Sequence, residues 1–239
     1  MKTLLRCFPN KVFGVSLTMK VCVLGSNGFI GSNLLHSYPE WTGVTRKHLD
    51  LTVQKDVDNF FEKNMFDVVV HCAVTGGSRL EEDTGEVCHK NLLMFENVAR
   101  HIDKFDKLVY FSSGASKRGN PPTDPYGLSK WLIDKRIEGI PNAYSLCIWG
   151  CYGFGELPTR FSAVCKTRGH VVIPQDKYFD FISVEEVARV VHKYCTQDCK
   201  KFYNLAPAEK LKLSEWATKF GATFTVEREG LGEPYFSRE

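Results

Sequence analysis

Three glycines spaced three residues apart constrain this chain more than any other feature of its sequence. Gly25, Gly28 and Gly31 directly follow the apolar run 21–24, and residues 32–36 continue with a helical pattern. We expect a short buried strand, a sharp turn with positive φ at Gly25, and a helix packed closely on the strand at Gly31. Without a side chain at Gly28, a pyrophosphate could approach the backbone at the helix N-terminus. The spacing predicts a dinucleotide site, with an ordinary strand-to-helix turn as the alternative.

Strand and helix patterns alternate along the first two thirds of the chain, from Val21 to Ile148. This alternation predicts an α/β fold of the Rossmann type, a doubly wound parallel sheet with helices on both faces. Beyond that point the periodicity weakens and Gly and Pro become frequent. We therefore predict three regions: an N-terminal extension (1–18), an NAD(P)-binding Rossmann domain (19–149), and a small C-terminal substrate-binding lobe (150–239) interleaved with the Rossmann core.

Charge and cysteine content argue against several classes of protein. The chain has 31 basic and 28 acidic residues, a formal net charge of +3, which is too balanced to indicate nucleic acid or a membrane surface. Its nine cysteines include no C-x-x-C pair, so we expect reduced thiols in a cytoplasmic protein and no metal site. No apolar run reaches membrane-spanning length. Residues 1–18 have the basic composition of a transit peptide, but Met19 directly before the first strand favours a simple extension.

A tyrosine and a lysine four residues apart follow the fourth strand pattern. On a helix, Tyr126 and Lys130 would share one face, one turn apart. An ammonium beside a phenol should lower the pKa of Tyr126 toward neutrality, which would make it a general acid or base for interchange of a hydroxyl and a carbonyl. A serine at the end of the preceding strand would hold the reacting oxygen. We assign Ser113 this role, with Ser112 or Ser116 as alternatives.

Two cations follow the second strand pattern. Arg46 and Lys47 stand where NAD-specific sites usually carry an acid that binds the ribose hydroxyls. Because a guanidinium can hold a 2′-phosphate through two hydrogen bonds, we predict NADP as the cofactor. If the two cations are only solvated surface charges, NAD is the alternative.

The glycine spacing, the Tyr126-to-Lys130 motif and three later segments together resemble the extended short-chain dehydrogenase/reductase family of nucleotide-sugar epimerases, dehydratases and reductases. The later segments are 146–153, 180–188 and 202–205. The resemblance implies an NAD(P)-dependent enzyme that acts on a nucleotide-sugar, and it is compatible with a homodimer. Motif and resemblance together give the expected cofactor-binding set: Gly25, Asn27, Gly28, Phe29, Ile30, Gly31, Arg46, Asp50, Leu51, Cys72, Ala73, Val74, Asn91, Tyr126 and Lys130.

The chain also departs from the family's patterns. Gly114 stands where many members carry a catalytic Ser or Thr, and residues 115–116 replace the acid pair of 4,6-dehydratases. These departures favour chemistry at C4: NADPH-dependent reduction of a 4-keto sugar nucleotide, or NAD-dependent 4-epimerisation. A non-catalytic, dinucleotide-sensing regulator is a third reading, disfavoured because a sensor needs neither Tyr126 nor Lys130.

Other titratable residues fall outside these motifs. His71 lies in an apolar strand, where a hydrogen-bonded core residue is a better reading than a catalyst. Four cations in or next to the Gly- and Pro-rich segment could bind a substrate diphosphate, or could be surface charges: Arg160, Lys166, Arg168 and Lys177.

Overall fold

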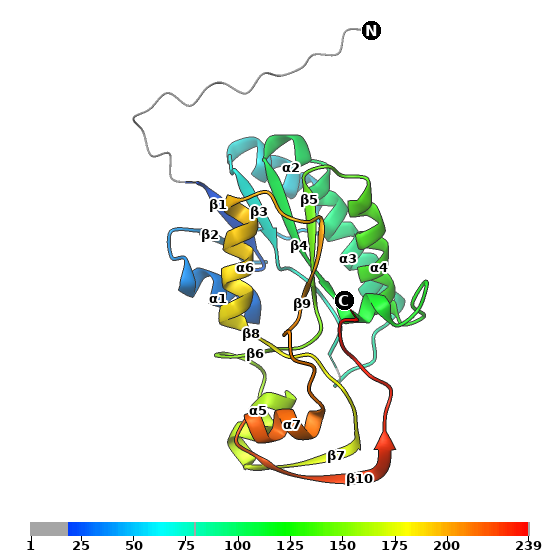
Figure 1. The fold of residues 1–239 in the computed structure, drawn as a ribbon. Coiled ribbons are helices and arrows are strands. Elements are labelled where there is room, and N and C mark those ends of the chain that lie inside the picture. Colours follow the sequence, from blue (N-terminus) through cyan, green and yellow to red (C-terminus); the bar gives the residue numbers. More distant parts are fainter. Residues whose placement is uncertain (1–18, 79, 239) are drawn as a thin grey trace.

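The computed structural model describes residues 19–78 and 80–238, so the predicted extension 1–18 lies outside the described residues. Its centre is a six-stranded sheet in the order β2-β1-β3-β4-β5-β9, and every neighbouring pair is parallel (Figure 1). The predicted doubly wound Rossmann fold is therefore confirmed. The strands are β1 (Val21–Leu24), β2 (Thr42–Val44), β3 (Val68–His71), β4 (Lys107–Ser113), β5 (Ala143–Ile148) and β9 (Phe202–Leu205).

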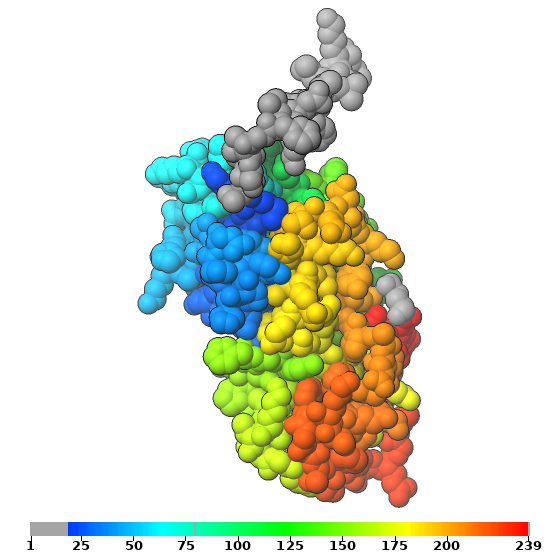
Figure 2. All heavy atoms as spheres, turned by 60° about the vertical axis from the view of Figure 1, so that its left-hand side comes forward, coloured from blue at the N-terminus to red at the C-terminus, as the bar shows by residue number. Residues whose placement is uncertain are grey.

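Helices cover both faces of this sheet, because its strands are buried on both sides. Successive residues of β1 point to opposite faces: Val21 and Val23 join the apolar cluster under α1 and α6, whereas Cys22 and Leu24 join the cluster under α2, α3 and α4. Figure 2 shows α1 (blue) and α6 (yellow) side by side over the first face. The helices are α1 (Phe29–Ser37), α2 (Gln54–Lys63), α3 (Gly85–Ala99), α4 (Pro125–Glu138) and α6 (Val184–Thr196), with short turns η1 (Ile102–Lys104) and η2 (Gly114–Lys117).

A smaller lobe lies beyond the carboxyl ends of the strands (Figure 1). It contains two parallel pairs, β7 with β10 and β6 with β8, and two short helices. The chain leaves the lobe to form α6 and β9 and then returns, so the predicted range 150–239 includes two elements of the Rossmann body. The lobe elements are β6 (Cys151–Tyr152), α5 (Phe161–Arg168), β7 (His170–Asp176), β8 (Ile182–Ser183), α7 (Leu213–Lys219) and β10 (Thr223–Leu231).

The position of α4 matters most for the site. Asp124 caps this helix by accepting a hydrogen bond from the Gly127 N–H at 2.7 Å, and Pro125 occupies its first position. One turn beyond Lys130, the carboxylate of Asp134 accepts hydrogen bonds from Ser112 on β4 and Ser145 on β5, both at 2.7 Å. Because all three polar groups are buried, this network fixes the position of α4 along the direction of β4 and β5.

His71 is a core residue, as expected, but the expected hydrogen bond is wrong. Its ring packs between Phe95 and Tyr110, with ring centroids 6.3 and 5.7 Å away. Neither ring nitrogen makes a well-formed hydrogen bond within the described residues. Burial, reinforced by the nearby charge of Lys130, lowers the pKa of His71 to about 4, which keeps the ring neutral at pH 7.

Three further findings concern the described residues only. Their eight cysteines are free thiols. No set of three or more His, Cys, Asp or Glu side chains among them is arranged to hold a metal ion. Among the helices of the described chain, none is both long and apolar enough to cross a membrane.

Candidate active site

The turn from β1 into α1 has the geometry that the glycine spacing predicts. Gly25 has φ 79°, and an added Cβ would lie 2.7 Å from the backbone of Ala73. An added Cβ at Gly31 would lie 2.5 Å from the Gly25 carbonyl oxygen, so α1 rests directly on the turn. At Gly28 the nearest atom to an added Cβ is 3.4 Å away, which leaves the approach to the helix N-terminus open.

A cavity of about 860 Å³ lies at the carboxyl ends of the strands and continues toward the lobe. This is the crevice in which doubly wound sheets bind ligands, and its volume is near the upper end of the range for ligand pockets. The structure brings nearly the whole predicted cofactor set to its walls: Gly25, Asn27, Gly28, Phe29, Ile30, Gly31, Arg46, Asp50, Leu51, Cys72, Ala73, Val74, Tyr126 and Lys130.

Asn91 is the member of the predicted set that does not line the cavity. Its side-chain oxygen accepts a hydrogen bond from the Thr75 N–H at 2.9 Å, and its amide donates to the Thr75 carbonyl at 3.0 Å and to Ser129 at 3.1 Å. The side chain is 3% exposed. Asn91 therefore fixes the loop after β3 from behind, which supports the cavity wall without direct contact with its contents.

Arg46 and Asp50 lie together at the edge of the cavity. The Arg46 Nε lies 3.2 Å from an Asp50 carboxylate oxygen, and the Arg46 side chain is 79% exposed. Two hydrogen bonds from Thr52, and the weaker one from Arg46, lower the pKa of Asp50. Lys47, which sequence reasoning paired with Arg46, lies on a neighbouring depression and not on the cavity wall.

Tyr126, Lys130 and Ser113 meet on the wall of this same cavity. Tyr126 and Lys130 are one turn apart on α4, and Ser113 ends β4. The Ser113 hydroxyl accepts a hydrogen bond from the Ala115 N–H at 3.2 Å and is near enough to the Tyr126 phenol to lower its pKa. The Lys130 ammonium donates to the Phe111 carbonyl at 2.7 Å and lies 5.6 Å from the Tyr126 ring centroid. The predicted trio is thus assembled, with the lysine beneath the phenol ring rather than bonded to its hydroxyl.

The two alternative serines occupy other roles. Ser112 donates its hydroxyl to Asp134, so it is part of the network that holds α4. Ser116 is 1% exposed and does not line the cavity. The geometry therefore favours Ser113 over both.

The expected lowering of the Tyr126 pKa is wrong. Burial raises the pKa of Tyr126 to about 12, and the contact with Ser113 offsets only part of this rise. Burial also lowers the pKa of Lys130 to about 8, while the charge of Asp134 opposes that shift. Desolvation therefore outweighs charge–charge attraction in the closed pocket, and Tyr126 carries its proton at neutral pH.

Sequence reasoning missed several residues around Tyr126. An added Cβ at Gly77 would lie 2.7 Å from the Tyr126 ring, so the loop after β3 lies directly against the phenol. The Asp83 carboxylate holds this loop by accepting two hydrogen bonds from the Gly77 N–H, at 2.9 and 3.1 Å. Arg118 and Tyr235 also line the cavity here. Gly77, in a loop at the end of a predicted strand, could have been identified from the sequence as a residue of the site. The residues around Tyr235 carry no motif that would place it there.

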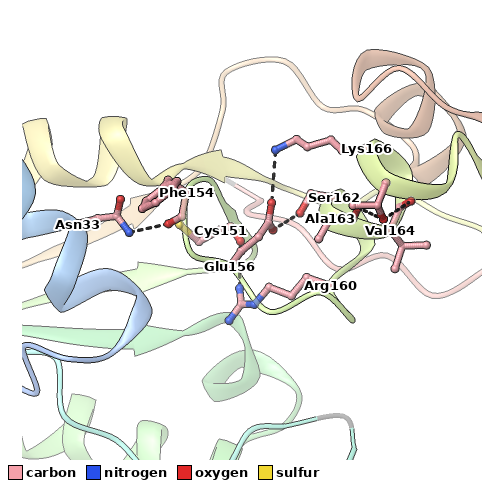
Figure 3. Close-up of polar contacts among 10 residues, drawn as sticks. Asn33, Cys151, Phe154, Glu156, Arg160, Ser162, Ala163, Val164 and Lys166 are labelled. Atoms are coloured by element: carbon pink, nitrogen blue, oxygen red, sulfur yellow. Dashed lines mark hydrogen bonds and ion pairs between the residues drawn. The ribbon is translucent and has the colours of Figure 1, made fainter.

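The lobe meets the cofactor side of the cavity through the loop before α5 (Figure 3). Asn33 on α1 donates to the Phe154 carbonyl at 2.9 Å, and Arg160 donates to the Cys151 carbonyl at 3.0 Å. Lys166 instead lies 3.4 Å from the buried Glu156 carboxylate. Of the four predicted diphosphate partners, Arg160 and Lys177 line the cavity, whereas Lys166 and Arg168 do not.

The open approach at Gly28 gives a test of the dinucleotide site. Gly28→Val adds a branched side chain on the cavity side without a backbone clash, because φ is −77° there. We expect the melting temperature to stay within about 3 °C of the wild type, an effect below about 1 kcal/mol. We expect NADPH and NADH affinity to fall at least about tenfold, since the pyrophosphate loses its place.

Gly139→Val, at the far end of α4, is the matched control because it makes the same change at negative φ outside the cavity. Fluorescence titration with both dinucleotides measures the effect. Equal affinity in the Gly28 and Gly139 variants would show that the cofactor does not lie over this turn.

Comparisons with known proteins bear on the family and the fold of the chain. The model of the NAD dependent epimerase/dehydratase family matches residues 21–206. A search of curated protein sequences finds no significant match. Among solved structures, a dTDP-4-dehydrorhamnose reductase from Clostridium acetobutylicum shares 19% identity, with a TM-score of 0.76 over 87% of this chain and 83% of that one.

Two further solved structures are similar. A GDP-mannoheptose C4 reductase from Campylobacter jejuni, with NADP bound, shares 18% identity and has a TM-score of 0.72 over 94% of this chain and 91% of that one. A UDP-N-acetylglucosamine 4-epimerase from Bacillus cereus shares 19% identity and has a TM-score of 0.72 over 92% of this chain and 86% of that one. At these identities the likeness shows a common fold.

The family match extends from the first strand of the sheet to the last, and it includes the glycine turn and the Tyr126-to-Lys130 helix. The dinucleotide predicted from the glycine spacing is also the cofactor class for which the family is named. The resemblance seen in the sequence is therefore confirmed, and the chain belongs to the NAD-dependent epimerase/dehydratase family.

Proposed function

We propose that the protein reduces the 4-keto group of a nucleotide-sugar with NADPH. The observation that carries this proposal is the meeting of Tyr126, Lys130 and Ser113 on the wall of the cavity that begins at the glycine turn. A single ligand-binding space thus joins a phosphate-accepting helix N-terminus to a proton donor beside a hydroxyl.

The chain's own residues fit the reductive direction. The bound dinucleotide supplies a hydride to the carbonyl carbon. Tyr126 holds a proton at neutral pH because burial raises its pKa to about 12, and it gives this proton to the carbonyl oxygen. Ser113 donates a hydrogen bond that orients the same oxygen. Lys130 places a positive charge under the Tyr126 ring, which stabilises the phenolate left after the transfer.

The preference for NADP rests on Arg46. Its guanidinium lies at the cavity edge, where it forms an exposed ion pair with the Asp50 carboxylate. Breaking a surface ion pair of this kind costs little free energy. It can therefore turn to a 2′-phosphate and bind it through two hydrogen bonds.

A nucleotide-sugar substrate is supported by the cations on the lobe side and by the similar structures. Arg160 and Lys177 line the cavity, where they can bind a diphosphate. The similar structures are a dTDP-4-dehydrorhamnose reductase, a GDP-mannoheptose C4 reductase and a UDP-N-acetylglucosamine 4-epimerase.

NAD-dependent 4-epimerisation is the second candidate, and Asp50 is the observation that favours it. Its carboxylate lies on the same edge as Arg46 and could accept hydrogen bonds from the two ribose hydroxyls of NAD. In that reaction Tyr126 first takes a proton from the sugar hydroxyl and later returns it. A non-catalytic sensor gives no reason for the assembled trio.

Tyr126→Phe tests the proton-transfer role. The ring and its packing stay, but the transferable proton is lost, so we expect kcat for NADPH oxidation with a 4-keto sugar nucleotide to fall about 10²–10⁴-fold. NADPH affinity and melting temperature should stay close to wild type. Tyr144→Phe, a half-buried tyrosine on β5 away from the cavity, is the control. A Tyr126→Phe rate above about a tenth of wild type would contradict the assignment.

Arg46→Ala tests the cofactor preference. Charge-assisted hydrogen bonds contribute about 1.5–3 kcal/mol, and exposure of Arg46 places the loss near the lower end, on the order of tenfold in the NADPH dissociation constant. NADH affinity should change less than about threefold, because NADH lacks the 2′-phosphate. Lys47→Ala is the control, since Lys47 lies off the cavity wall. If the wild type binds NADH more tightly than NADPH, the epimerase proposal is favoured instead.

A further inference from the structure

The C-terminal tail, residues 232–238, returns from the lobe to the active site. Figure 1 shows it (red) leaving β10 and running back toward the Rossmann sheet. The Gly232 N–H donates to the Asp176 carbonyl at 2.7 Å, and the Tyr235 N–H donates to the Tyr178 carbonyl at 2.9 Å. The tail therefore runs along residues 176–180 through regular backbone hydrogen bonds.

The end of the tail is held by a buried carboxylate. Asp180 is 1% exposed, and one of its oxygens accepts hydrogen bonds from the Ser237 N–H at 2.7 Å and from the Lys210 ammonium at 2.8 Å. The Asp180 N–H also donates to the Tyr235 carbonyl at 3.2 Å. Because these hydrogen bonds hold the backbone at Tyr235 and on its C-terminal side, they fix where its side chain leaves the tail.

The Tyr235 ring is wedged among three side chains beside the catalytic trio. Its centroid lies 5.2 Å from that of Trp149 and 5.1 Å from that of Phe179, and the Arg118 guanidinium lies 5.5 Å from it. Tyr235, Ser113 and Tyr126 line the same cavity, and the Ser113 side chain is near enough to both phenols to offset part of the rise in pKa that burial causes in each. Ser113 thus lies between two phenols, one from α4 and one from the tail.

Gly114, directly after β4, lies against the Tyr235 and Trp149 rings. An added Cβ there would lie 2.9 Å from the Tyr235 ring carbon that carries the hydroxyl, and 2.4 Å from the Trp149 ring. A side chain at position 114 would therefore require both rings to shift, so the glycine lets Trp149 and Tyr235 pack against the end of β4.

We propose that Tyr235 is a catalytic residue of this enzyme, whose hydroxyl donates a second hydrogen bond to the substrate carbonyl oxygen beside Ser113. This inference rests on the proposed reductase function. As hydride adds to the carbonyl carbon, the C=O π pair moves to oxygen, and that oxygen takes the Tyr126 proton. Tyr235 keeps its own proton and stabilises the charge that develops on oxygen during the transfer.

Tyr235→Phe tests this role while the ring keeps its packing against Trp149 and Phe179. Loss of one hydrogen bond to a developing oxyanion costs roughly 10²–10³-fold in kcat. We expect kcat for NADPH-dependent reduction of a 4-keto sugar nucleotide to fall at least about tenfold, with KM changed less than about threefold. NADPH affinity and melting temperature should match wild type.

Tyr178→Phe is the matched control, because this tyrosine lies in the segment beside the tail, packs on Phe236 and does not line the cavity. Normal kcat in Tyr235→Phe, or a loss shared equally by KM, NADPH affinity and melting temperature, would overturn the role of Tyr235 while the reductase function stands. A wild-type protein that consumes no NADPH with any 4-keto sugar nucleotide would instead overturn the proposed function, and the Tyr235 role with it.

Discussion

The rest of the site depends on close backbone packing at the turn from β1 to α1. A Cβ at Gly31 would lie 2.5 Å from the Gly25 carbonyl oxygen, and one at Gly25 would lie 2.7 Å from the backbone of Ala73. These two contacts set α1 directly on the turn and the turn against the loop after β3. They also direct the first turn of α1 into the crevice where the strand order reverses. A bulkier residue at either glycine would displace the cavity wall, whereas Gly28 is open and leaves room for phosphate.

A second constraint positions the reacting groups at the other end of the cavity. Asp134 joins α4 to β4 and β5 through two buried serine hydroxyls, and this fixes the height of Tyr126 and Lys130 relative to Ser113. The residue that anchors α4 is Asp134, one turn after Lys130 and two turns after Tyr126. The Tyr126 phenol takes no part in this anchoring and faces the cavity. Burial then keeps Tyr126 protonated, with its pKa raised to about 12, which suits a group that must give a proton to a reduced carbonyl.

Local sequence patterns predicted what depends on local geometry. The strands 21–24 and 68–71, the glycine turn and the one-turn spacing of Tyr126 and Lys130 follow from side-chain period and backbone freedom. Effects that need the packed molecule could not be read this way. The local sequence gives no sign that burial would raise the pKa of Tyr126, or that Asn91 would lie behind the cavity wall. Tyr235 reaches Ser113 only because the tail docks along 176–180, a contact between distant parts of the chain.

The transfer of a labelled hydride tests the central claim most directly. The protein is incubated with NADPH carrying deuterium at the transferred position and with a 4-keto sugar nucleotide, and the product is examined by mass spectrometry and NMR. The account predicts one deuterium per product molecule, bound to the sugar's C4 carbon, and one equivalent of NADP formed. A product without deuterium at C4, or deuterium at another sugar carbon, would contradict reduction at C4 in this cavity.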